Sequence, residues 1–167
     1  VGMAGHLVTV FAVTYAVSSP VLVTLAGAVA PRRILFVAMS VFALANAVAV
    51  VAPTFELLLL SRAVAACRAA PFTSTALAVA SSLAPPEERG RALSFITGGL
   101  TVAFVIGIPL GSLIGTYSSW RMTFVMVAIL GAVAAVGIRT LPRVESPPIV
   151  SLRERVDTLR QPVVLAA

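Results

Sequence analysis

The 167-residue chain is 59% hydrophobic and only 11% charged, whereas a soluble globular domain carries about 25% charged residues. Its net charge of +6 comes from twelve arginines that are scattered between long apolar runs, and this scatter excludes the single basic stripe of a nucleic-acid-binding protein. With one cysteine (Cys67) and one histidine (His6), the sequence predicts no metal site, no cofactor and no enzyme.

Five apolar runs follow one another along the chain. They cover residues 7–29, 34–52, 57–80, 92–114 and 122–138. A helix needs roughly 20 mostly apolar residues to cross the hydrocarbon core of a bilayer, and these runs are far longer than ordinary strands and lack the alternation of a membrane barrel. The sequence therefore predicts an all-α membrane protein whose transmembrane bundle occupies residues 1–138.

The composition changes after the fifth run. Residues 139–160 are polar and contain three prolines, which is typical of a linker with at most a short surface helix. Residues 161–167 turn apolar again and resemble the start of a further span that is cut off. The first run is too long for a signal peptide, and no basic stretch precedes it.

The arginines predict the orientation of the chain. Five spans place nine arginines on one side of the membrane and only Arg121 on the other; the nine are Arg32, Arg33, Arg89, Arg91, Arg139, Arg143, Arg153, Arg155 and Arg160. Basic loops stay in the cytoplasm, so we expect the first residue outside, the tail inside and a location in the plasma membrane, such as the bacterial cytoplasmic membrane. A chain that starts outside without a signal also suggests a missing first helix.

Glycines form a stripe in the fourth run. Gly107, Gly111 and Gly115 recur every four residues, so they lie along one side of a helix, where small residues let two backbones touch. Pro109 removes one backbone N–H and predicts a bend. From these residues alone, simple helix packing and a moving gate remain equally open.

Two arginines fall inside the third run. Counted from Glu56 at 1.5 Å per residue, Arg62 lies about 9 Å and Arg68 about 18 Å into the membrane. Arg62 can extend its side chain to the interface, whereas a lone charge at the depth of Arg68 costs about 2.5 kcal/mol or more. No Asp or Glu lies in the five runs. We therefore expect Arg68 to face a missing helix, a water-filled cavity or an anionic substrate.

Gly98, Gly107, Gly111 and Gly115 resemble the antiporter motif in the fifth helix of drug–proton antiporters of the major facilitator superfamily. The motif's proline after the third glycine is Ser112 here, and its final glycine is Thr116. The segment around Arg89, Gly90 and Arg91 resembles that family's loop between helices four and five. The segment with Gly27, Arg32 and Arg33 resembles its loop between helices two and three, without the usual aspartate.

The resemblance is strongest to the arabinose-efflux and chloramphenicol-resistance branch, and it implies helices two to six of a twelve-helix transporter. Such a protein exports a drug or sugar in exchange for protons by alternating access, and its partners are the lipid bilayer, the missing first helix and the C-terminal half. Arg62 matches the arginine of the family's helix-four motif, which favours a role in substrate or proton coupling. Arg68 and Asn46 are further candidates. The alternative is a truncated, non-transporting fragment or a helical packing module.

Overall fold

The computed structural model describes residues 2–26 and 29–141 and consists of helices. In chain order these are α1 (Gly2–Ala26), α2 (Pro31–Val51), α3 (Phe55–Leu83), the single 3-10 turn η1 (Pro86–Glu88), α4 (Arg89–Tyr117) and α5 (Trp120–Ile138). The predicted all-α class is confirmed. Gly27, most of the predicted linker (residues 142–160) and the predicted start of a further span at 161–167 lie outside the described residues.

Four of these segments are long and apolar enough to cross a membrane. They are α2, α3, the η1–α4 segment Pro86–Tyr117, and α5. Within the described part of α1, the apolar stretch is shorter and covers Gly5–Ser19. The structure therefore supports a multi-pass membrane protein.

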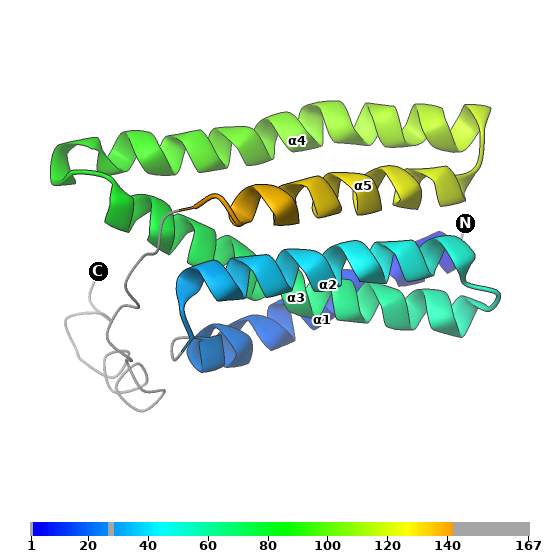
Figure 1. Ribbon diagram of the computed structural model, residues 1–167. Helices are drawn as coiled ribbons and strands as arrows, with labels where there is room; N and C mark the ends of the chain where they lie inside the picture. The colour runs from blue at the N-terminus through cyan, green and yellow to red at the C-terminus, as the bar shows by residue number, and fades with distance from the viewer. Residues whose placement is uncertain (1, 27–28, 142–167) are drawn as a thin grey trace, which may run out of the picture.

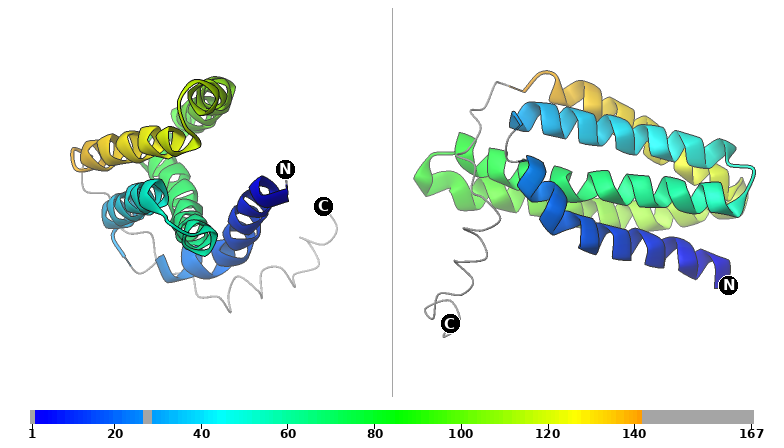
Figure 2. Two further views of the ribbon diagram at one scale, coloured as in Figure 1. Left: turned by 90° about the vertical axis from the view of Figure 1, so that its right-hand side faces the viewer. Right: turned by 90° about the horizontal axis from the view of Figure 1, so that it is seen from below.

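Successive helices run antiparallel in a bundle (Figure 1), and α3 contacts α1, α2 and α4. Helix α2 packs against both α3 and α5, and α1 packs against α3. Helix α4 has a smaller contact with α3 and with α5, and Figure 2 shows it on the outside of the bundle. Small residues fill much of the interior, among them Ala38, Ala43, Ala45, Ala49, Ala65, Ala66 and Ala70. Such residues let helices approach closely where lipid provides no hydrophobic driving force.

Helices α3 and α4 extend beyond their apolar runs at both ends, and the other helices begin earlier than their runs. Helix α2 begins at Pro31, because a proline fits the first turn of a helix, where its missing N–H has no acceptor in any case. Arg32 and Arg33 therefore lie in the first turn of α2 instead of a loop. The predicted loop around Arg89 is likewise shorter than expected, since Arg89, Gly90 and Arg91 form the first turn of α4. Helices α3 and α5 are capped by the side chains of Thr54 and Ser119.

Helices α2 and α5 are fastened to each other at both ends. A guanidinium nitrogen of Arg32 donates to the carbonyl of Arg139, which ends α5. At the other end Arg121 donates to the carbonyls of Val50 and Ala52, and the bond to Ala52, which ends α2, is 3.1 Å long. Each arginine is the second residue of its helix, and each reaches the residue that caps the other helix. A cation at a helix C-terminus satisfies free carbonyls and complements the helix dipole.

Between the two ends, a glycine brings α2 and α5 into direct contact. Gly131 is buried, and a Cβ atom added there would lie 3.2 Å from Cβ and 3.4 Å from Cα of Ala43. Spacing this short leaves no room for a larger side chain unless one backbone moves. The α2–α5 pair is thus held by hydrogen bonds at its two ends and by close packing in the middle.

Candidate functional site

Two of the three predicted coupling residues come together where α2, α3 and α5 meet. The side chain of Asn46 on α2 is fully buried, and its Oδ1 accepts a 3.1 Å hydrogen bond from Nη2 of Arg62 on α3. Asn46 Nδ2 donates to the carbonyl of Phe42 at 2.7 Å, one turn back in its own helix. That bond fixes the amide so that its oxygen points at the arginine.

The guanidinium of Arg62 also lies over an aromatic ring. Its Cζ is 4.4 Å from the ring centroid of Phe124 on α5, within the range of a cation–π interaction. Its Nε is buried and has no hydrogen-bond partner within residues 2–26 and 29–141. No ion pair is present among the residues that the structure describes, so the charge of Arg62 is held by one amide oxygen and one ring face. A cation held this way in a medium of low dielectric responds strongly to any anion that approaches it.

Arg68, the third coupling candidate, lies apart from this cluster. It is six residues from Arg62 on the same helix, which turns the two side chains about 120° apart. Its side chain is exposed on the surface of the described bundle. The structure therefore separates the two arginines: Arg62 is half-buried between α2, α3 and α5, and Arg68 lies on the outer face of the bundle.

The glycine stripe of α4 has a neighbouring helix over only part of its length. A Cβ atom at Gly111 would lie 3.4 Å from Cγ2 of Thr123 on α5, and one at Gly115 would lie 4.0 Å from the hydroxyl of that residue. Thr123 also donates a 3.3 Å hydrogen bond to the carbonyl of Gly111. Gly107 and Gly98 face open space, and α4 continues through Pro109 as one helix in which no residue is buried.

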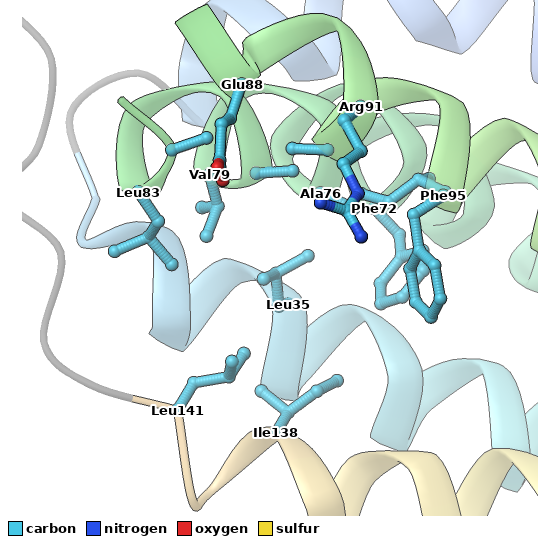
Figure 3. Close-up of a pocket in the computed structure, with 14 residues that line it drawn as sticks. Leu35, Phe72, Ala76, Val79, Leu83, Glu88, Arg91, Phe95, Ile138 and Leu141 are labelled. Atoms are coloured by element: carbon cyan, nitrogen blue, oxygen red, sulfur yellow. The ribbon is translucent and has the colours of Figure 1, made fainter. Parts of the chain in front are cut away.

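A pocket of about 540 Å³ opens where α3 ends and α4 begins (Figure 3). Its walls are mainly apolar and come from four helices, with Leu35 on α2, Phe72 and Val79 on α3, Phe95 on α4 and Ile138 on α5. Glu88 and Arg91 are its charged lining residues, and in Figure 3 both side chains extend toward the space. Arg91, predicted as part of a loop motif, thus lines a pocket.

Sequence reasoning missed Phe124 and Gly131. Phe124 is one apolar residue in an apolar run, so the sequence contains no signal that marks its ring as the partner of a cation. Gly131 is an isolated glycine, and only the position of Ala43 on another helix distinguishes it from Gly137, which has no atom within 4 Å of an added Cβ.

Comparison with known proteins places the chain in a family. Residues 1–166 match the family model of the Major Facilitator Superfamily. The chain is 37% identical, over its full length, to a chloramphenicol resistance protein of Streptomyces lividans, and 34% identical over 91% of its length to the uncharacterized MFS-type transporter YfhI of Bacillus subtilis. It is 30% identical over 98% of its length to the inner membrane transport protein YdhP of Escherichia coli.

The aligned region makes up 44%, 38% and 42% of these three relatives, so the chain spans about two fifths of their length. Their names describe transporters or a resistance protein and not enzymes. The match of the family model over nearly the whole chain agrees with the helical bundle described above and with the resemblance that the glycine and arginine motifs carry. The chain belongs to the Major Facilitator Superfamily.

Proposed function

We propose that this chain is part of a secondary transporter that exports a small molecule, a drug or a sugar, in exchange for protons by alternating access. The observation that carries the proposal is Arg62, a cation inside a membrane-spanning helix that is held by Asn46 and Phe124 and has no carboxylate partner in the described part of the chain. An intramembrane charge that is kept in place by dedicated contacts is typical of a substrate or ion pathway. The chloramphenicol resistance protein among the relatives makes a drug the first substrate to test.

The rest of the transport pathway is supplied by the remainder of the transporter. In secondary transporters the substrate binds near the bilayer midplane, between structural repeats. A first helix and a C-terminal half would complete the site beside the helices described here. Arg68, on the outer face of the bundle, is placed to meet these parts or the substrate between them.

Coupled flux through the full-length transporter that contains this chain tests the proposal. Reconstituted in proteoliposomes with a pH gradient, it should move at least one compound of a panel that includes chloramphenicol. Arg62→Ala should lower the flux by about tenfold or more, because removal of the charge removes the coupling group. Leu60→Ala, a change at an exposed position two residues earlier in α3, is the matched control and should retain the flux. Full activity of Arg62→Ala, or no flux of any compound in the unchanged protein, would refute the proposal.

The 167-residue chain by itself should show no proton-driven flux in the same assay. A midplane site between two halves cannot form when one half is absent. Robust uptake by this chain alone would favour the alternative that several copies assemble one pathway. A full-length protein without flux would favour the helical packing module.

The proposed orientation puts the α3–α4 connection in the cytoplasm and the α4–α5 turn outside. Both sites accept a cysteine, since Gly90 has no atom within 4 Å of an added Cβ and Ser118 is exposed. In a Cys67→Ser background, an impermeant thiol reagent applied to intact cells should label Ser118→Cys and spare Gly90→Cys. The reversed pattern would overturn the orientation.

A further inference from the structure

The contacts of Arg62 continue beyond Phe124 to the end of the bundle. The ring of Phe124 meets the ring of Trp120, one turn earlier in α5, edge to face, with centroids 5.8 Å apart and an interplanar angle of 88°. The guanidinium of Arg121 lies over the Trp120 ring, with Cζ 4.7 Å from the ring centroid, and donates to the carbonyl of Ala52 at the end of α2. An unbroken series of contacts thus leads from Arg62 through two rings to Arg121.

We propose that Phe124 and Trp120 are positioning residues for Arg62. They hold its guanidinium against Asn46. Through the contact of Trp120 with Arg121, they also fix the position of the guanidinium relative to the C-terminal end of α2. This inference rests on the proposed function, in which Arg62 couples substrate or proton movement, and it adds the residues that set where that charge lies.

The electrostatics of the series support a positioning role. Asn46 supplies a single acceptor, and the Nε of Arg62 is buried without one. The negative face of the Phe124 ring replaces part of the hydration that the cation loses, and this attraction grows when the cation is desolvated. The perpendicular arrangement of the two rings is one of the two that their quadrupoles favour, so the contact with Trp120 helps to fix the direction in which the face of Phe124 points.

Phe124 also packs against the core cluster of Ala49 and Ala52 at the end of α2 and Leu58 on α3, so its ring fills space between helices in addition to contacting Arg62. The α2–α5 contact is already closed by Gly131 against Ala43, and its ends are closed by Arg32 and Arg121. Of the two rings, Phe124 contacts the guanidinium of Arg62 on α3, and Trp120 contacts Phe124 and Arg121. Removal of the negative face of the ring with its shape kept should therefore weaken the contact with Arg62 and leave the pairing of α2 with α5 in place.

A double-mutant cycle on the 167-residue chain in detergent micelles tests the contact without any transport assay. Far-UV circular dichroism follows unfolding of the unchanged chain, Arg62→Met, Phe124→Leu and the double variant. The change in the unfolding constant of the double variant should differ from the product of the two single changes by roughly threefold to thirtyfold, as expected for a partly desolvated cation–π pair. The matched control cycle pairs Phe124→Leu with Arg68→Met, an arginine on the exposed face, and should be additive. Equal non-additivity in both cycles would overturn the proposal.

Incorporation of 3,4,5-trifluorophenylalanine at position 124 separates electrostatics from packing. This residue keeps the shape of the ring and removes most of its negative face, so it should abolish most of the coupling with Arg62 while the chain still folds. Phe124→Tyr keeps the face and should retain the coupling, and Trp120→Leu should weaken it about threefold. Full coupling with the fluorinated ring would show that Phe124 only fills space and would overturn the inference.

Transport by the full-length protein completes the test. Phe124→Leu should lower coupled flux several-fold at normal membrane abundance, and Phe124→Tyr should restore it. If the unfolding cycle shows that Arg62 and Phe124 are coupled and Phe124→Leu nevertheless transports at the full rate, the positioning role is overturned. Absence of flux in the unchanged protein would instead refute the proposed function alone, because the cycle measures the Arg62–Phe124 contact independently.

Discussion

Helices α4 and α5 are neighbours in the chain, yet they use glycine in opposite ways. Helix α4 contains a stripe of three glycines and buries no residue, whereas α5 buries Gly131 against Ala43 of α2. Helix α5 is also hydrogen-bonded to α2 at both ends, through Arg32 and Arg121. A run of small residues thus permits a close helix contact. It does not reveal whether a neighbouring helix packs against that run. In this bundle α2 and α5 form a closely packed pair, and α4 leaves most of its surface exposed.

The largest effect is expected where the α2–α5 contact is tightest. Gly131→Val would drive a branched side chain into the backbone of Ala43 and should destabilise the chain by about 1–3 kcal/mol. Gly137→Val, six residues later in the same helix, meets open space and carries the same intrinsic cost of valine in a helix. Unfolding in micelles, followed by circular dichroism, should separate the two variants. Equal stability would mean that α2 and α5 do not touch as described.

A smaller effect is expected at the ends of the α2–α5 pair. Arg121→Met keeps most of the apolar stem but removes the donors to Val50 and Ala52, and it should cost about 1 kcal/mol. Arg33→Met changes an exposed arginine and should stay within about 0.5 kcal/mol of the unchanged chain. The same unfolding assay measures both. A loss at Arg33 as large as that at Arg121 would argue for a general effect of charge instead of a specific link between the helices.

The smallest effect on stability is expected in α4. Gly111→Ala places a methyl group 3.4 Å from Thr123, an ordinary contact, and Gly107→Ala meets open space, so both should change stability by less than about 0.5 kcal/mol. If the stripe seals the pathway against the rest of the transporter, Gly111→Ala should still lower coupled export by the full-length protein and raise passive proton leak. Export and proton flux, measured in parallel with substrate binding as control, decide this. Unchanged coupled export would remove the gating role, and loss of protein in step with activity would favour packing.

The contrast between Arg62 and Arg68 marks how far the sequence predicts the candidate site. Both arginines were recognised as intramembrane charges, because position and hydropathy are properties of the sequence. Their environments were not predictable, since the partner of Arg62 is an amide sixteen residues earlier on another helix and a ring sixty-two residues later on a third. A side chain that contacts residues so distant in the chain acquires its role only when the helices pack.

The linear sequence determined the class of this protein. Long apolar runs in lipid can satisfy their backbone groups only as helices, so composition and run length sufficed to predict five of them. The motifs with Gly107, Gly111, Arg89 and Arg91 sufficed for the family. Tertiary structure alone decided which small residue makes a contact, which arginine is enclosed and which pair of helices is fastened at both ends. These properties depend on which faces of the helices meet, and the positions of residues along one chain do not specify those faces when nearly every residue is apolar.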